Sequence, residues 1–338
     1  MRKHAGHTTL KDVAEAAGVS ISTVSRAFSN PERLSPATVQ HVKEVAARLR
    51  FSVNPVAKAL ITGTSSNIGL VVPDISNPYM STLLKAAQAH SRGRGIGVFA
   101  ADTDENASTE REVCDQLAKQ TRGLVLCSSR MSVTHIRELA ELIPLVLVNR
   151  VVKGVPSLYS DSTAALYELV DELVDLGHRH LAYMPGPVQS WTNKQRSRAI
   201  SKRVAARGAE LVTLASTSPS YAGGRAAAPQ VLESGATAVM AFDDVLASGL
   251  VEGLRRLDCS VPRDISVTGH DDVLAELVYP GITTVTGQSV RIGRLAVDWL
   301  LEDPIGDDSE SALTRVVEGR VIRRGSVAAP PSPVSSPP

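Results

Sequence analysis

Residues 9–28 read TLKDVAEAAGVSISTVSRAF, and this stretch decides how the amino end of the chain folds. Within it, Ala14, Gly18 and Val24 supply a small residue, a glycine and a β-branched residue. The small residue lets two helices cross closely, the glycine permits a positive φ in the turn, and the β-branched residue packs the second helix against the first. The spacing therefore predicts a helix-turn-helix, whose second helix enters the major groove of DNA.

Capping residues divide this region into three short helices. Thr9 and Ser20 precede the first two helices as N-caps, and Ser35-Pro36 opens the third with a cap and a proline at the first helical position. Gly18 ends the first helix, and Asn30-Pro31 ends the second. Three helices between residues 9 and 50 predict a small bundle.

Charge is distributed unevenly along the chain. Residues 1–64 hold nine Lys or Arg against four Asp or Glu, a net charge of +5, whereas the remainder carries −4. A basic segment joined to a mildly acidic body favours a polyanion as the partner of that segment. On charge alone, a merely solvated basic surface explains the excess as well as nucleic-acid binding does.

The composition is that of a soluble globular protein with more than one domain: 338 residues, 43% hydrophobic and 21% charged. No apolar run approaches the ~18 residues that span a bilayer, and no apolar stretch follows the first residues, so we expect neither a membrane span nor a secretory signal. The three cysteines, Cys114, Cys127 and Cys259, are odd in number and lack metal-ligand spacing. They fit a reducing cytoplasm, and we expect no disulfide framework, metal site or cofactor.

From Ile68 onward, short apolar runs alternate with amphipathic, helix-like stretches. The runs are residues 68–72, 97–101, 124–127, 145–148, 181–184, 211–214, 238–242 and 265–268. Runs that are apolar on both faces and separated by helices predict parallel strands in α/β layers. Eight such units are too many for one sheet, so we predict two doubly wound halves that part near residues 150–160. Their strand ends would line a ligand-binding cleft.

Motifs of enzyme chemistry are missing from the sequence. Gly93-x-Gly95-x-Gly97 precedes a strand and does not open a helix, so it fails as a dinucleotide fingerprint. There is no phosphate-binding loop, no Gly-x-Ser-x-Gly and no His-Glu-x-x-His. His178-Arg179-His180 has metal-like spacing but no third ligand, and we interpret it as structural. The sequence therefore predicts a protein that is not an enzyme.

The stretch at residues 9–26 resembles the head of the LacI/GalR family of transcriptional regulators. The resemblance runs from about residue 8 to 325, through NPVAKAL (54–60), VPDISNPY (72–79), LGHR (176–179), FDD (242–244), VPRDISV (261–267) and GHDD (269–272). It implies a helix-turn-helix head (1–52), a hinge helix and linker (53–64), and an α/β body like that of periplasmic sugar-binding proteins (65–326). In the family, the chain crosses between the two subdomains near 150–160 and again near 285. We predict that the proline- and serine-rich tail, 327–338, is disordered.

The resemblance places Ile21, Ser22 and Arg26 at base edges, with Arg26 as the best candidate for a bidentate contact to guanine, typically worth ~1–3 kcal/mol of discrimination. Packing of Ile21 and simple exposure of Ser22 are the alternatives. Phosphate contacts are implied for Thr23, Ser25 and Asn30. The complete expected DNA-binding set is Thr9, Ser20, Ile21, Ser22, Thr23, Ser25, Arg26, Asn30, Asn54, Ala57, Lys58 and Leu60.

The segment Asn54–Leu60 resembles the hinge helix of the family and is too short to be stable alone. By resemblance it forms when two copies meet in the minor groove, where Leu60 acts as an apolar wedge. Two positions depart from the family pattern. Lys58 replaces a common arginine, which weakens groove recognition but keeps the charge. Arg50 replaces a common glycine or asparagine, so a positive φ there would cost on the order of 1 kcal/mol.

The body is implied to bind an effector between its subdomains. The expected effector-binding residues are Tyr79, Met80, Arg150, Asp161, Ser190, Trp191, Thr192, Arg196 and Asp271. Arg196 and Asp271 are the firmest, because a carboxylate accepts twice and a guanidinium donates in a fork, as vicinal hydroxyls require. Trp191 either covers a sugar ring or packs between subdomains, and Asp74 either faces the cleft or caps a strand end.

His270 replaces the aromatic residue that is usual before the Asp271-Asp272 pair. A titrating imidazole beside Asp271 would make effector binding depend on pH. The plainer interpretation, which we favour, is a hydrogen-bonded imidazole that replaces an aromatic ring.

These expectations describe a homodimeric transcriptional regulator, most consistent with a repressor. We expect it in the cytoplasm, associated with the nucleoid. It would bind a pseudo-palindromic operator under the control of a small molecule, by family weighting a sugar or sugar derivative. We expect a dimer because the Pro/Ser-rich tail stands where a tetrameric member of the family has the heptad repeats that join its four chains. The alternatives are a sugar-binding protein without operator binding, disfavoured by the basic head, and a sugar-metabolising enzyme, which turnover of the ligand would distinguish.

Overall fold

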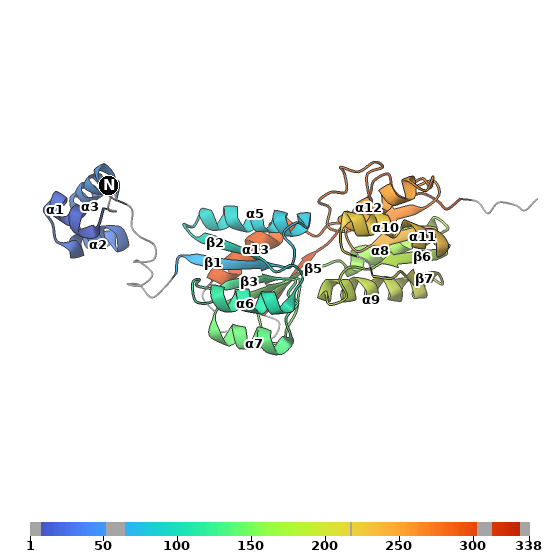
Figure 1. Cartoon of the computed structure of the whole chain (residues 1–338), viewed down its shortest axis with the longest axis horizontal. Coiled ribbons are helices and arrows are strands. Elements are labelled where there is room, and N and C mark those ends of the chain that lie inside the picture. The colour runs from blue at the N-terminus through green and yellow to red at the C-terminus, as the bar shows by residue number, and fades with distance from the viewer. Residues whose placement is uncertain (1–7, 52–64, 217, 303–312, 332–338) are drawn as a thin grey trace, which may run out of the picture. The chain divides into compact units, whose positions relative to one another are not determined.

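The computed structural model describes residues 8–51, 65–216, 218–302 and 313–331. The chain divides into two compact units between residues 66 and 67 (Figure 1). The predicted hinge helix, with Asn54, Ala57, Lys58 and Leu60, lies outside the described residues. No described helix is long and apolar enough to cross a membrane.

The amino-terminal unit is a bundle of three α-helices. Its elements are α1 (Leu10–Ala17), α2 (Ile21–Ser29), the 3₁₀ helix η1 (Pro31–Arg33) and α3 (Pro36–Arg48). Val13, Ala14, Val24 and Val42 lie at its centre, each at most 3% exposed. Ala14 and Val24 therefore occupy the helix crossing that their spacing predicts.

The predicted caps of these helices are confirmed. The Thr9 side chain accepts from the Asp12 amide while the Asp12 carboxylate accepts from the Thr9 amide, which forms a capping box. Gly18 ends α1 in the left-handed region with φ 64°, and the Ser20 hydroxyl caps α2 by accepting from the Thr23 amide. Arg50 also has a positive φ, 52°, so the strain expected of a non-glycine residue at this position is present.

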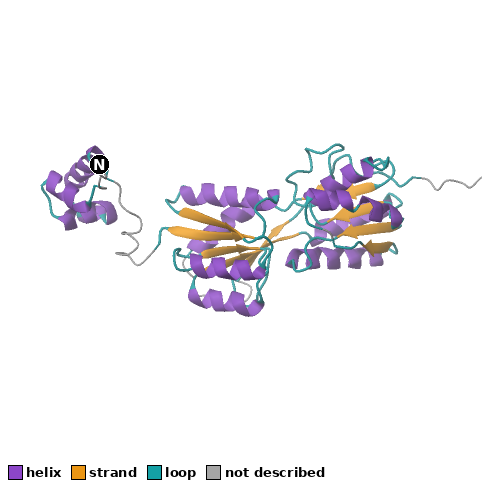
Figure 2. Ribbon diagram, viewed as in Figure 1, coloured by secondary structure: helices purple, strands orange, loops and turns teal. Residues whose placement is uncertain are grey.

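The first lobe of the body is a six-stranded parallel sheet in the order β11-β5-β4-β3-β1-β2. Helices α5 and α13 pack on one face and α6 and α7 on the other (Figures 1 and 2). The strands are β1 (Asn67–Val72), β2 (Gly97–Asp102), β3 (Leu124–Cys127), β4 (Leu145–Val148), β5 (Ser157–Asp161) and β11 (Thr314–Glu318). The helices are α5 (Pro78–Arg92), α6 (Ala107–Leu117), α7 (Val133–Leu142) and α13 (Ser289–Leu301).

The second lobe is a four-stranded parallel sheet in the order β7-β6-β8-β9, with a two-stranded antiparallel pair, β10 and β12, beside it. Its strands are β6 (His180–Met184), β7 (Glu210–Thr213), β8 (Ala238–Ala241), β9 (Ser266–Thr268), β10 (Thr284–Val285) and β12 (Val321–Ile322). Its helices are α8 (Thr163–Asp175), α9 (Trp191–Ala206), α10 (Tyr221–Ala226), α11 (Ala228–Glu233) and α12 (Asp244–Arg255). Helices α8 and α9 cover one face of this sheet, and α11 and α12 cover the other.

All eight predicted apolar runs form strands, but within the described residues the chain passes between the lobes three times, not twice. The first passage follows β5 at residues 161–163, after the predicted boundary, and the second lies at 285–289. The third, at 318–321, was not predicted. The sequences of β5, SLYSD, and of β11, TRVVE, contain no continuous apolar run. In agreement with this, β5 has only two buried residues and β11 only one. They form strands because they pair with each other and, in the case of β5, with β4.

The prediction that residues 327–338 are disordered is wrong for 327–331, and 332–338 lie outside the described residues. The carbonyl of Ala328 accepts from the His178 ring Nε2 at 2.9 Å, and its amide donates to the Ser266 hydroxyl at 3.1 Å. Val327 packs against the core of the second lobe. These partners are 60 and more residues away in the sequence, so the composition of the tail could not reveal them.

Candidate functional site

The exposed face of α2 is the candidate surface for DNA. Val24 and Ala27 point into the bundle, whereas Ile21 is 50% exposed and Ser22 and Arg26 are also exposed. Packing of Ile21, the alternative interpretation, is therefore wrong. Thr23, Ser25 and Asn30 are partly exposed at the margins of this face. The structure thus places the proposed base-reading side chains together, and their contacts with bases remain predictions.

The cleft between the lobes is the candidate effector site, with about 510 Å³ of free space including its open side. Its lining includes Tyr79, Met80, Ser190, Thr192, Arg196 and Asp271 from the predicted set. The residues not predicted are Pro73, Asn77, Glu105, Ser128, Arg130, Asn149, Pro187, Pro219, Phe242 and Asp243. Asp74 also lines it, as one of the two interpretations proposed, and its carboxylate accepts from the amide and hydroxyl of Ser76 in the turn after β1.

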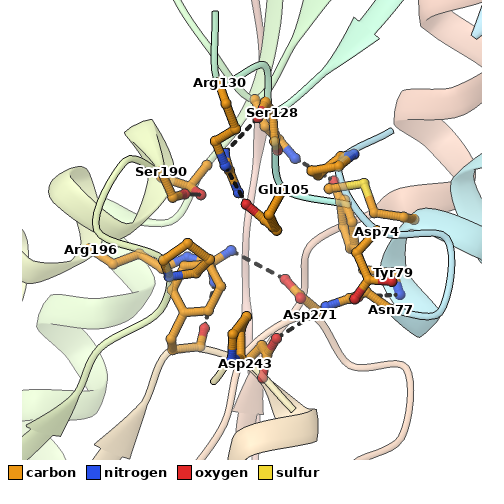
Figure 3. A pocket seen from close by; sticks show the side chains of 17 residues that line it. Asp74, Asn77, Tyr79, Glu105, Ser128, Arg130, Ser190, Arg196, Asp243 and Asp271 are labelled. Carbon is orange, nitrogen blue, oxygen red and sulfur yellow. Dashed lines mark hydrogen bonds and ion pairs between the residues drawn. The ribbon is translucent and has the colours of Figure 1, made fainter. Parts of the chain in front are cut away.

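Arg196 and Asp271 form a direct ion pair, with 3.2 Å between Nη2 and Oδ1 (Figure 3). Both side chains are almost buried, and the guanidinium also lies 4.7 Å from the centre of the Phe242 ring. Burial alone would raise the pKa of Asp271, but the charge of Arg196 and the hydrogen bond from His270 hold it below its ordinary value. Asp271 has φ 101°, and its amide is held by the carbonyl of Val285 at 2.7 Å. The second passage between the lobes therefore positions this carboxylate.

Tyr79 connects the start of α5 with two other parts of the cleft. Its hydroxyl accepts from Asn149 Nδ2 at 3.0 Å and donates to the carbonyl of Gly287 at 3.3 Å. Burial raises the pKa of this hydroxyl above its ordinary value, so it stays a neutral donor. Asn149 and Ser128 follow β4 and β3 directly, both with positive φ. The rule that ligands lie at the carboxyl ends of parallel strands could have found these two residues.

A second ion pair, between the buried Arg130 and the partly exposed Glu105, faces the same cleft (Figure 3). The Arg130 side chain is 4% exposed, and its Nη2 donates to Glu105 Oε1 at 2.9 Å. Both residues lie in loops after strands, but they are 25 positions apart and belong to no motif. No sequence signal pairs them.

Asp243 and Asp244 are adjacent but have different roles. Asp243 lines the cleft, caps α12 through the Leu246 amide, and accepts from Asn77 Nδ2 of the first lobe at 3.2 Å. Burial and the charge of Asp271 raise the pKa of Asp243 to about 7. Asp244 instead accepts from the hydroxyl of Thr284 at 2.6 Å, and burial raises its pKa to about 7 as well. The sequence offered no basis for separating these roles.

Arg150, Asp161 and Trp191 are predicted effector residues that do not line this cleft. Arg150 donates to the carbonyl of Ser129, behind the cleft wall. Trp191 packs edge-on against Tyr159 with 5.2 Å between the ring centres, which is the packing alternative. Asp161 and Trp191 line an adjoining pocket that shares Thr192 and Arg196 with the cleft. Their side chains face the first passage between the lobes.

His270 is fully buried where the passages between the lobes meet. Its Nδ1 lies 2.8 Å from Asp271 Oδ1, and its Nε2 lies 2.8 Å from the hydroxyl of Ser162. Burial and the nearby charge of Arg196 lower the pKa of His270 to about 4. The ring is therefore neutral near pH 7, which agrees with the hydrogen-bonded imidazole that we favoured. No group of three or more His, Cys, Asp or Glu in the described part of the chain could hold a metal ion.

Comparison with known proteins identifies the class of protein that this geometry defines. Residues 9–54 match the model of bacterial regulatory proteins of the lacI family, and residues 170–327 match that of the periplasmic binding protein-like domain. The regulator DegA of Bacillus subtilis is 32% identical over 85% of this chain and 88% of its own length. The repressor CytR of Escherichia coli is 28% identical over 98% and 99%. A lac repressor dimer bound to operator and the anti-inducer ONPF has the same fold, with a TM-score of 0.85 at 22% identity over 96% of this chain and all of that one.

The chain belongs to the lacI family of bacterial regulatory proteins. It is a DNA-binding transcriptional regulator with a helix-turn-helix head and a periplasmic-binding-protein-like body. The relatives named above are regulators of transcription.

Proposed function

We propose that this regulator is a homodimeric repressor that binds a pseudo-palindromic operator and is controlled by a small molecule held in the cleft. The proposal depends on one observation above all. Two opposed lobes place two ion pairs and several hydroxyl groups around one polar cleft. Such a cleft suits a sensor of polar metabolites better than a catalyst, because both of its arginines are already paired with carboxylates.

The passages between the lobes supply the mechanism for this control. Three short segments connect the lobes in the described chain, and the second of them contacts residues of the cleft: its Val285 carbonyl accepts from the Asp271 amide, and its Gly287 carbonyl accepts from the Tyr79 hydroxyl. Ligand contacts with both lobes would therefore favour one angle between them over another. If that angle decides whether two heads can bind DNA together, ligand and operator are linked by a coupling free energy, typically ~1–3 kcal/mol, that acts equally in both directions.

Dimer formation requires an accessible surface on the body. The loop after β9 exposes Leu277 by 75% and Tyr279 by 94%, which is unusual for side chains of this size. We place a contact between two copies on this loop, since each would lose that apolar surface to the other. A protein acting this way works on chromosomal DNA, in the cytoplasm, as a dimer.

One experiment tests both parts of the proposed function, selective DNA binding and its control by a ligand. Genomic fragments bound by the purified full-length protein are selected, and one bound fragment is titrated by fluorescence anisotropy with and without a library of sugars. A ligand present at a hundred times its dissociation constant should also stabilise the protein by ~2.7 kcal/mol in a thermal-shift assay. Selective DNA binding that a stabilising ligand changes supports the proposal.

Two results would contradict it. Binding of a ligand without selective DNA binding would favour a binding protein that does not act on an operator. Conversion of the ligand into a product would favour a sugar-metabolising enzyme. Such an enzyme would need a general acid or base and a nucleophile that act on the ligand.

A further inference from the structure

The charged groups that line the cleft come in equal numbers from both lobes. Asp74, Glu105 and Arg130 belong to the first lobe, and Arg196, Asp243 and Asp271 to the second. The described lining thus holds four carboxylates and two guanidinium groups, with no lysine and no histidine. The excess of carboxylates gives the site a chemical preference that the fold alone does not dictate.

Both arginines are already neutralised by the protein. The Arg130 guanidinium donates to the Glu105 carboxylate through Nε and Nη2, and to the carbonyl of Ser128 through Nη1. The Arg196 guanidinium donates to Asp271 and to the carbonyl of Phe242. An anionic ligand would have to displace Glu105 from the buried Arg130 or the almost buried Asp271 from Arg196, and leaving Asp271 unpaired is costly.

Two carboxylates remain that no Lys, Arg or His of the described chain pairs with at ion-pair distance. Asp74 accepts from the amide and hydroxyl of Ser76, and Asp243 accepts from the Leu246 amide and from Asn77 Nδ2. Asp243 is almost fully buried, at 1% exposure, so its negative charge is poorly solvated. A ligand that donates hydrogen bonds would stabilise both groups, whereas a second negative charge would repel them.

Helix N-termini normally attract anions, and three of them lie at this cleft. The helices are α5, α9 and α12, which begin after Asn77, Ser190 and Asp243. Each of these residues lines the cleft and uses its own side chain to accept from the first turn of its helix. One backbone donor of each first turn is therefore occupied, and one of the caps is itself a carboxylate, which disfavours a phosphate there.

We propose, on the basis of the function proposed above, that the effector is rich in hydrogen-bond donors and carries no negative charge: an uncharged polyhydroxylated molecule or its amine derivative. Phosphorylated and carboxylated sugars are excluded. Asp74 and Asp243 impose this selectivity, because neither carboxyl group lies at ion-pair distance from a cation of the described chain, and the ionised fraction of Asp243 adds a negative charge that only Arg196, beyond ion-pair distance, offsets.

The first test separates a metabolite extract by ion exchange into anionic, uncharged and cationic fractions. Each fraction is added to the full-length protein, and the shift in melting temperature is measured. We expect stabilisation by the uncharged or cationic fraction. Stabilisation by the anionic fraction alone would overturn this inference and leave the proposed function standing. If no fraction stabilises the protein, the proposed function fails, and this inference fails with it.

The second test uses inorganic phosphate as a defined probe. The double variant Asp74→Asn/Asp243→Asn keeps the hydrogen-bond acceptors of both side chains and removes both charges. We expect it to bind phosphate at least about tenfold more tightly than the wild type, measured by calorimetry. Asp115→Asn, an exposed site on α6, is the matched control and should leave the affinity of the wild type unchanged. Equal affinities in the wild type and the double variant, or no binding by either, would refute the role of these two carboxylates.

Discussion

Replacing Arg196 by methionine tests most directly how much the ion pair between Arg196 and Asp271 contributes to the stability of the protein. Methionine keeps much of the side-chain volume and removes the charge that faces Asp271. At 3.2 Å and an effective dielectric constant of about 20, two unit charges attract each other by about 5 kcal/mol. The two side chains are only 12% and 11% exposed, so solvent screens this attraction weakly. Because an unpaired buried carboxylate remains, we expect Arg196→Met to lower the free energy of unfolding by about 3–5 kcal/mol.

A double-mutant cycle isolates the ion pair from the other contacts of Arg196. Arg196→Met removes the contact with the Phe242 ring whether or not the second substitution, Asp271→Asn, is present. The contribution of that contact therefore cancels in the cycle. We expect the double variant to be more stable than the sum of the single effects predicts, by about 2 kcal/mol or more.

Urea unfolding followed by tryptophan fluorescence measures this quantity, because Trp191 and Trp299, the two tryptophans of the chain, both lie in the body. Arg255→Met is the control, since Arg255 pairs with Glu252 while its own side chain is 71% exposed, and such pairs contribute at most about 1 kcal/mol. Additivity of the two cleft substitutions within about 0.5 kcal/mol would refute the inferred pairing.

Three further predictions concern DNA reading, pH dependence and assembly. Arg26→Ala should relax preference at one operator position by ~1–3 kcal/mol in a selection from randomised sites, whereas Ser25→Ala, at an implied phosphate contact, should weaken all sites alike; unchanged preference would contradict base contact by Arg26. His270 has a pKa of about 4 in the folded protein against an ordinary 6.5, so between these pH values the unfolded chain binds a proton that the folded protein does not. The free energy of unfolding should therefore fall by up to about 3 kcal/mol as the pH falls from 6.5 to 4. Urea unfolding of His270→Gln at several pH values should lack this acid-side loss, and an unaltered pH profile would count against it. Tyr279→Ser should shift the sedimentation coefficient towards that of a monomer, while Leu142→Ser, at a position 76% exposed on α7, should not; a persistent dimer would move the contact elsewhere.

Parts of the cleft were predictable from the sequence because strand ends mark ligand sites in parallel sheets. Tyr79, Arg196 and Asp271 were found through their place in the family pattern, and Ser128 and Asn149 follow apolar runs closely enough to have been found too. Glu105 and Arg130 were not predictable. Each is an ordinary charged loop residue in the sequence, and only the packing of two loops brings them together as a pair.

The amino acids by themselves determined those features whose causes lie within a few residues of each other. The caps at Thr9, Gly18 and Ser20, and the eight apolar strands, follow from local hydrogen bonding, backbone conformation and side-chain burial. Only the tertiary structure decided the strands β5 and β11, the binding of Ala328 to the second lobe, and the ionisation of Asp243. Those features depend on hydrogen-bond partners and on burial supplied by segments far away in the chain, and no local pattern records which segments will meet.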